Sequence, residues 1–322
     1  MQSPFDAVLV IAFGGPQGPA DVRPFLENVV RGRRVPPARL DEVAAHYARF
    51  NGVSPITDVT TRQARGIEDR LRTADVPLPV FVGMRNWHPY LAETLTDMAS
   101  RGIRRAIGLV MAPHRSFSSC TQYRQNVRDA QHEVASMGVP AAHVTYVGDW
   151  HAHPKFIEAT RQHLMSALAR LDVGVRTDAR VVFTAHSLPE SMTGALVYRA
   201  QVTESARLVA AAAGVSDWTV AFQSRSGRPE DPWLGPDVCE CLRAAAGTVP
   251  AVAVLPIGFV ADHIEVLYDL DCEAAAVCRE QALPMVRAET VNLHPLFLDM
   301  AAEMIADVSA RYRTGRPLPI LP

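Results

Sequence analysis

The sequence predicts an α/β protein with two similar halves, each a four-stranded parallel sheet flanked by helices. Three observations lead to this prediction. Short apolar runs alternate with longer stretches of helical spacing, as in βα units. The runs are apolar throughout, which is typical of strands covered on both faces. The chain has 322 residues, of which 48% are hydrophobic and 20% charged, so two domains of about 150 residues each are expected.

The first half contains four predicted strands, and Gly, Pro or a polar turn closes each of them. They are residues 7–13, 79–83, 106–111 and 144–147. A long insert, residues 31–72, separates the first strand from the second and has turn-rich edges. Because long excursions after strands often carry binding residues, we expect this insert to contribute to a site.

The second half repeats the same scheme. Its predicted strands are residues 180–185, 218–222, 251–256 and 284–287. We place the domain boundary between the two sets, which gives an N-terminal domain over 1–152 and a C-terminal domain over 153–322. The last helical stretch, residues 296–312, is expected to cross back and pack on the first domain.

Composition excludes several classes of protein. The formal net charge is −2, so no long-range field gathers nucleic acid or anionic lipid. No apolar stretch approaches the ~20 residues needed to span a bilayer, and the N-terminus does not resemble an export signal. The five cysteines are an odd number in a large chain, unlike a disulfide-stapled secreted domain. We therefore expect a cytoplasmic protein without an integral membrane segment.

A histidine follows the fifth predicted strand directly. In open α/β sheets ligands bind where the strands end, and His186 lies at that point in Thr184-Ala185-His186. Such a histidine can act as a general base near neutral pH. The other interpretation is a histidine hydrogen-bonded within a turn.

Three carboxylates follow the seventh predicted strand at four-residue spacing. If a helix begins near Asp262, then Glu265, Asp269 and Glu273 line one side of it at intervals of about 5.4 Å. Like charges in such a row repel, so the row favours a track of hard oxygen ligands for a divalent cation. The alternative is a solvated acidic face in which Asp262 caps the helix and Glu265 is its capping-box partner.

Two arginine-rich segments are candidate binding sites for the carboxylates of a ligand. Arg31 and Arg33 lie in the insert, and Arg225 follows the sixth predicted strand. Arginine makes forked contacts with carboxylates. Phosphate-binding glycine motifs and the nucleophile elbow of α/β hydrolases are absent from the sequence, which argues against those two classes of enzyme.

Several of these segments together resemble the ferrochelatases, over nearly the whole chain. The segments that carry the resemblance are Phe-Thr-Ala-His-Ser-Leu-Pro at 183–189, Phe-Gln-Ser-Arg-Ser-Gly at 222–227 with Pro-Trp-Leu at 232–234, and Phe-Val-Ala-Asp-His-Ile-Glu-Val-Leu-Tyr-Asp-Leu-Asp at 259–271. Shorter matches are Gly-Val-Ser-Pro at 52–55, Gly-Met-Arg at 83–85 and Asn-Leu-His-Pro-Leu-Phe at 292–297.

This resemblance implies two Rossmann-like domains of the class II chelatase type, with a porphyrin in the cleft between them and Fe²⁺ as the metal inserted. It implies that His186 accepts the pyrrole protons and that Glu265 completes the central metal site opposite it. Asp269 and Glu273 then deliver hydrated iron. The substrate-binding positions implied are Phe13, Arg31, Arg33, Ser54, His114 and Tyr123.

The sequence departs from the family at the first strand. Some bacterial relatives carry a tyrosine where this chain has Phe13, and its phenolate meets the iron of the product. Phe13 cannot do so, and His114 is either a substitute ligand or a loop histidine with a structural hydrogen bond. Certain family members bind a 2Fe-2S cluster through C-terminal cysteines; we expect no such cluster here and no required cofactor, since Fe²⁺ is a substrate.

The resemblance favours coproporphyrin III as the porphyrin, because the Phe-Gly-Gly-Pro start and the Arg-Gly-Arg insert look like the soluble bacterial branch. Protoporphyrin IX is the close alternative. A cobalt or nickel chelatase for sirohydrochlorin and a non-catalytic porphyrin or haem carrier are the other candidates. A haem-accepting enzyme is a further expected partner.

Overall fold

The computed structural model describes residues 3–32, 35–226 and 230–316, and it divides into two compact units. One unit takes the chain through Met111, together with Ser118–Gly148 and the stretch from Leu298 onward. The other takes Ala112–Phe117 and Asp149–Phe297. Both units are discontinuous in sequence, whereas the expected domains 1–152 and 153–322 are continuous, and that domain division stays a prediction.

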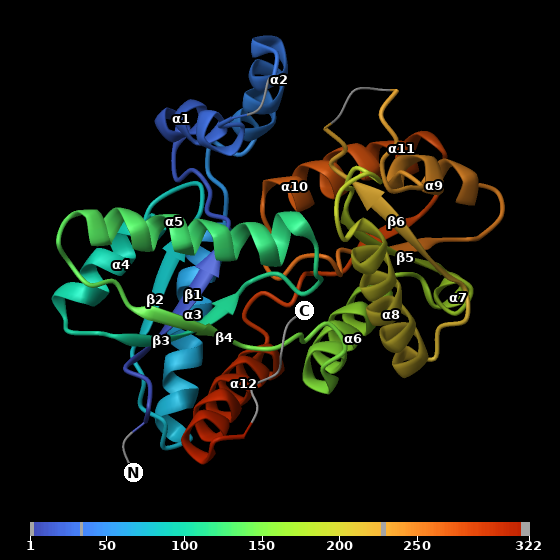
Figure 1. Cartoon of the computed structure of the whole chain (residues 1–322). Coiled ribbons are helices and arrows are strands. Elements are labelled where there is room, and N and C mark those ends of the chain that lie inside the picture. Colours follow the sequence, from blue (N-terminus) through green and yellow to red (C-terminus); the bar gives the residue numbers. More distant parts are fainter. Residues whose placement is uncertain (1–2, 33–34, 227–229, 317–322) are drawn as a thin grey trace. The chain divides into compact units, whose positions relative to one another are not determined.

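The first unit is built on a parallel sheet in the order β2-β1-β3-β4 (Figure 1). The strands are β1 (Ala7–Ala12), β2 (Val80–Met84), β3 (Arg105–Val110) and β4 (His143–Tyr146). β1 is buried along its whole length, which explains why its sequence is apolar without alternation. Each strand lies within one residue of its predicted position.

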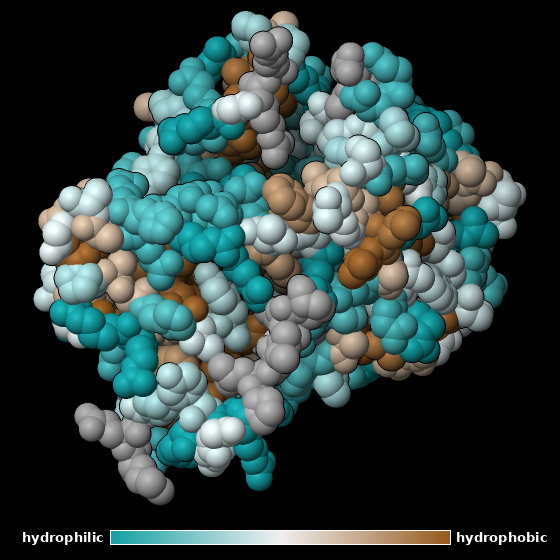
Figure 2. Space-filling model, viewed as in Figure 1, coloured by the Kyte–Doolittle hydropathy of each residue, from teal (hydrophilic) through white to brown (hydrophobic). Residues whose placement is uncertain are grey.

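Helices cover both faces of this sheet. Leu9 and Ile11 pack with α4 (Leu91–Ser100) and α5 (Gln122–Ser136) in one apolar cluster. On α5 the buried residues recur at three- and four-residue spacing, from Tyr123 to Val134. The outer surface over α5 is mainly hydrophilic (Figure 2).

The predicted insert is largely helical. It contains α2 (Pro37–Ala48) and most of α3 (Ile56–Thr73), and α1 (Pro19–Val29) precedes it. Within this unit α1 and α2 lie beyond the arrowhead end of β1 (Figure 1). From Leu298 onward, α12 (Pro295–Thr314) contacts α3, since Arg70 forms an ion pair with Asp299.

The second unit repeats the topology with a parallel sheet in the order β6-β5-β7-β8. Its strands are β5 (Arg180–His186), β6 (Trp218–Gln223), β7 (Val252–Leu255) and β8 (Met285–Arg287). Together the two sheets confirm the predicted α/β fold of two four-stranded parallel sheets, as far as the described residues extend.

In the second unit a short acidic segment packs against the sheet. α6 (Pro154–Leu168), α7 (Val173–Arg176), α8 (Ala195–Ala213) and α9 (Val238–Ala245) precede this segment. The segment itself consists of α10 (Ile264–Val266), the π-helix η2 (Leu267–Ala274) and α11 (Ala275–Glu280). Another π-helix, η1 (Phe117–Thr121), lies where the chain passes from the second unit to the first, and it directly precedes α5.

Close packing at Gly258 supports the end of β5. The Gly258 amide donates to the Thr184 carbonyl at 3.0 Å, and a Cβ at this position would lie 2.6 Å from the Cβ of Ala185. We expect Gly258→Ala to lower the free energy of unfolding by about 1–3 kcal/mol through overpacking. Urea unfolding measures this effect, with Gly174→Ala in α7 as the control because that site is open. Equal stability of the two variants would contradict the packing argument.

Candidate active site

His186 is the last residue of β5 and pairs with Gln223 at the end of β6. Its Nδ1 atom lies 2.5 Å from the Ser187 carbonyl oxygen, so Nδ1 carries the hydrogen in the neutral ring. The lone pair is then on Nε2, and the side chain is 32% exposed. His186 therefore has a turn hydrogen bond and also a basic nitrogen open to a reacting group, which joins both sequence interpretations.

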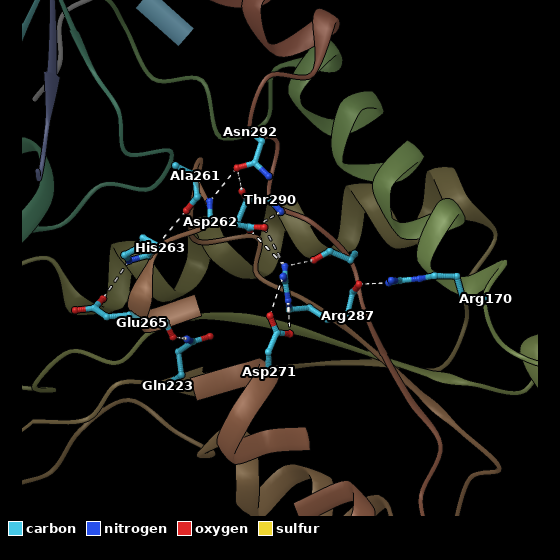
Figure 3. Close-up of polar contacts among 11 residues, drawn as sticks. Arg170, Gln223, Ala261, Asp262, His263, Glu265, Asp271, Arg287, Thr290 and Asn292 are labelled. Atoms are coloured by element: carbon cyan, nitrogen blue, oxygen red, sulfur yellow. Dashed lines mark hydrogen bonds and ion pairs between the residues drawn. The ribbon is translucent and has the colours of Figure 1, made fainter. Parts of the chain in front are cut away.

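The carboxylate of Glu265 lies between two histidines. Its Oε2 atom is 3.9 Å from His186 Nε2 and 3.4 Å from His263 Nε2. His263 in turn approaches the Ala261 carbonyl oxygen through Nδ1, at 3.1 Å (Figure 3). The three side chains form a group in which one carboxylate oxygen serves two imidazoles.

His263 was not among the site residues predicted from the sequence. This residue immediately precedes α10 and has an extended backbone, with φ of −150°. Its side chain therefore does not follow the helical spacing that was used to align the carboxylates. The sequence does show that His263 stands only two residues before Glu265, and this proximity could have indicated a contact between them.

Electrostatics favour an ionised Glu265. Burial raises the pKa of this carboxyl, but His186 and His263 outweigh burial and lower the pKa to about 2. Burial is the largest influence on the pKa of His263 and lowers it, but the hydrogen bond and charge of Glu265, with the Ala261 carbonyl and the charge of Asp262, together outweigh burial and raise that pKa above its usual value. Glu265 is therefore a fixed negative charge that can stabilise a protonated imidazole.

A helix begins near Asp262 as expected, but only its first turn, α10 with Glu265, is α-helical, and Asp269 and Glu273 lie on the π-helix η2. A π-helix closes i→i+5 hydrogen bonds and has more residues per turn than the 3.6 of an α-helix. Four-residue spacing is therefore nearly one full turn in η2. The carboxylates follow this spacing, and so does the row beside them, Val266, Leu270 and Ala274, which is fully buried against the sheet.

The capping alternative is wrong for Asp262. Its carboxylate accepts from the Thr290 amide at 3.2 Å and from Arg287, and the residue at the helix start is His263. Arg287 competes for this carboxylate from a strand that is distant in sequence. The side chain of Glu265 likewise faces two histidines and does not reach back as a capping partner.

Asp269 contacts the end of β6. Its Oδ2 atom accepts from Ser224 Oγ and, at 3.3 Å, from Gln223 Nε2. Burial raises the pKa of Asp269 to about 7, and repulsion from Glu265 and Glu273 acts in the same direction. This contact of Gln223 and Ser224 with Asp269 was not predicted, although both residues lie in the segment 222–227 that resembles the ferrochelatases.

The raised pKa of Asp269 predicts pH-dependent stability. The folded-state value of about 7 exceeds the ordinary 3.8, so the folded protein binds this proton more tightly than the unfolded chain does. Ionising Asp269 therefore reduces stability progressively from about pH 4 to pH 7. We expect Asp269→Asn to raise Tm relative to the parent protein, by more at pH 8 than at pH 5. Calorimetry at both pH values checks this; a difference independent of pH would contradict it.

The row changes in exposure along its length. Glu273 is exposed and Asp269 is half-buried, whereas Glu265 contacts the two histidines. Among the residues that the structure describes, no group of three or more His, Cys, Asp or Glu side chains is arranged to hold a metal ion. The set His186, Glu265, Asp269 and Glu273 as metal ligands stays a prediction.

Three of the expected substrate-binding residues lie near the end of β1 in the first unit. Phe13 follows β1 and packs against the apolar cluster that contains buried Tyr123. The Ser54 amide donates to the Pro16 carbonyl at 2.8 Å, which holds buried Ser54 beside the Gly14-Gly15-Pro16 turn. Substrate binding by these residues stays a prediction.

The remaining expected substrate residues differ in their surroundings. Arg31 is exposed, and its guanidinium donates to Asn28, whereas Arg33 lies outside the described residues. His114 belongs to the second unit and is 2% exposed, and its Nε2 atom lies 3.0 Å from Ser205 Oγ. Burial lowers the pKa of His114 to about 3. This environment is typical of a structural histidine, and we leave His114 out of the proposed site.

The sequence matches a known family along most of its length. The family model named Ferrochelatase matches residues 5–308. A coproporphyrin III ferrochelatase from Mycobacterium avium is 46% identical over 316 residues, which cover 97% of this chain and 89% of the relative. A ferrochelatase from Rhodopirellula baltica is 41% identical over 307 residues, with coverages of 94% and 86%.

Solved structures resemble the fold at low sequence identity. SirB from Bacillus subtilis with Fe³⁺ has a TM-score of 0.59 and 12% identity, and the alignment covers 98% of both chains. The sirohydrochlorin chelatase SirB from Bacillus subtilis subspecies spizizenii, in complex with cobalt, has a TM-score of 0.57 and 11% identity, with the same coverages. This likeness confirms the class II chelatase-like fold. In the described part of the chain, none of the helices has the length and apolar character to cross a membrane.

Proposed function

The chain belongs to the ferrochelatase family, and from this premise we propose that it inserts Fe²⁺ into coproporphyrin III in haem biosynthesis. The observation that carries the proposal is the carboxylate of Glu265, which lies between His186 at the end of β5 and His263 at the start of α10. Metallation replaces two pyrrole N–H bonds by bonds to iron and releases two protons. A base and a fixed negative charge are therefore the groups that the reaction needs.

His186 accepts the pyrrole protons through Nε2, the nitrogen that does not bond to the Ser187 carbonyl. Protonation creates an imidazolium 3.9 Å from the ionised Glu265 carboxylate, which stabilises it. Because the His186 side chain is partly exposed, it can release the first proton to water before it accepts the second. Glu265 and His186 are thus the proposed catalytic pair.

Iron reaches this pair along the acidic row. Glu273, at the exposed end, meets the hydrated cation first, and Asp269 and Glu265 follow at four-residue intervals on η2 and α10. Carboxylate oxygens suit a divalent cation and can replace its water ligands one at a time. Iron is a substrate in this scheme, and we propose no resident cofactor and no 2Fe-2S cluster.

Coproporphyrin III is the favoured porphyrin because the Mycobacterium avium relative, 46% identical, carries that substrate in its name. The four propionates of coproporphyrin III are anionic. The proposed contacts for them are Arg31, which is exposed, and Arg33, which lies outside the described residues. Phe13, Ser54 and Tyr123 are the proposed contacts for the ring. We further propose that the protein works in the cytoplasm and passes its product to a haem-accepting enzyme.

A comparison of porphyrins tests the substrate. Anaerobic assays with Fe²⁺ and either coproporphyrin III or protoporphyrin IX should give a kcat/KM ratio of about tenfold or more in favour of coproporphyrin III. The reason is that one charge-assisted contact to a propionate is worth about 1.5–3 kcal/mol. A preference for protoporphyrin IX would support the alternative substrate and overturn this part of the proposal.

A further inference from the structure

Arg287 joins two segments that flank the catalytic pair. It is the last residue of β8, and its side chain is 14% exposed. Its backbone is also held, because the Ala288 amide donates to the Val254 carbonyl at 2.8 Å and Arg170 donates to the Arg287 carbonyl. The guanidinium therefore extends from a fixed point on the sheet.

That guanidinium contacts two carboxylates at once (Figure 3). It forms a fork with Asp271 in η2, through Nε at 2.6 Å and Nη2 at 2.9 Å. Its Nη1 atom lies 3.3 Å and 3.4 Å from the two oxygens of Asp262. One cation thus joins the residue before His263 to the π-helix that carries Asp269.

Asp262 is held from a second side as well. Its carboxylate accepts from the Thr290 amide, and its own amide donates to Asn292 Oδ1 at 2.9 Å. The Thr290 hydroxyl also donates to Asn292 Oδ1. These bonds fasten the loop after β7 to the loop after β8 (Figure 3).

The anchored Asp262 determines where the next residue can lie. His263 has an extended backbone and caps the start of α10, where its carbonyl accepts from the Val266 and Leu267 amides. These bonds hold its main chain and not its imidazole ring. The imidazole contacts Phe259, Ala261 and Glu265, all within four residues of it in the chain. Long-range hydrogen bonds hold this segment on both sides of His263. Asp262 is bound by Arg287, Thr290 and Asn292, and the Glu265 carbonyl accepts from Gln223.

We propose that Arg287 is a positioning residue for iron insertion: by holding Asp262 and Asp271, it keeps His263 in contact with Glu265 and fixes the π-helix beside them. This inference rests on the proposed function. Arginine suits the task because its planar fork binds one carboxylate in a fixed orientation while the remaining nitrogen binds another, which the single ammonium of lysine cannot do.

The first test is steady-state kinetics with coproporphyrin III and Fe²⁺. We expect Arg287→Gln to lower kcat about tenfold or more with little change in KM for the porphyrin, and Arg287→Lys to restore part of the loss. Arg180→Gln is the matched control, since Arg180 forms an ion pair with Asp217 at the other end of the same sheet. A folded Arg287→Gln variant with the kcat of the parent protein would overturn the proposal.

Two further variants keep the inference testable if Arg287→Gln does not fold. Asp271→Asn removes the exposed end of the fork, and we expect a smaller fall in kcat. In a double mutant with His263→Ala, Arg287→Lys should cause a smaller loss than it causes alone, because part of its effect acts through His263. Additive losses, or unchanged kcat in both Asp271→Asn and Arg287→Lys, would overturn the proposal.

A readout without turnover separates this inference from the proposed function. The imidazole NMR signals of His263, assigned with His263→Ala, should shift in Arg287→Lys and Asp271→Asn and stay in place in Arg180→Gln. Unshifted signals would contradict the positioning role. If the parent protein fails to metallate porphyrin, the proposed function fails, while the NMR comparison still tests the role of Arg287.

Discussion

His186→Ala should lower kcat for iron insertion by about 10²–10⁴-fold, the usual contribution of a general base, and leave the affinity for coproporphyrin III nearly unchanged. The reason is that the imidazole accepts protons from a ring that other residues hold. Stopped-flow absorbance measures metallation, and quenching of protein fluorescence measures porphyrin binding.

The control for this loss is His132→Ala, which removes an exposed histidine from α5. It should retain full activity. If His186→Ala metallates at the rate of the parent protein, His186 is not the base. If it loses porphyrin binding along with turnover, the side chain binds substrate and the assignment of a proton transfer is wrong.

Glu265→Gln should lower kcat about 10- to 100-fold. The amide keeps the size of the side chain but loses the negative charge that faces His186 and His263. A hydrogen bond to a charged group is worth about 1.5–3 kcal/mol, and each 1.36 kcal/mol corresponds to about tenfold in rate. The pKa of His263 should fall in the same variant, because its hydrogen bond to Glu265 raises that pKa.

Kinetics and NMR titration of the same protein check both effects. Glu240→Gln on α9 is the control, since it removes an exposed carboxylate from the same unit. An unchanged pKa for His263 would show that the two side chains do not interact in solution. An unchanged kcat would remove Glu265 from the catalytic pair.

The fold was predictable because its strands are buried on both faces. Mainly apolar runs such as 7–13 and 180–185 located the strands of both sheets to within one or two residues. The helical content of the insert was harder to predict, since α2 buries Tyr47 alone among its described residues.

The site was predictable in part. His186 and the acidic row follow strands, and that placement is visible in the sequence. The π-helix was not, because the buried residues Val266, Leu270 and Ala274 suit a helix of either kind at four-residue spacing. The distinction depends on which backbone hydrogen bonds form, and side-chain polarity does not encode it.

Long-range contacts account for the remaining differences. Asp262 is a residue type that often caps helices, and it lies near the start of one. Its carboxylate instead binds Arg287, which is 25 residues further along the chain. His263 is part of the candidate site because its ring contacts Glu265 and because the neighbouring Asp262 is held by Arg287. A single sequence contains the partners of each contact without indicating which pairs form.

The most direct measurement is the amount of iron coproporphyrin formed per molecule of protein, under anaerobic conditions with excess Fe²⁺ and coproporphyrin III. We predict many product molecules per molecule of protein, seen as the shift of the Soret band on metallation, and a steep loss in Glu265→Gln. Tight porphyrin binding with no metallation beyond the rate without protein would contradict the proposed function and indicate a carrier.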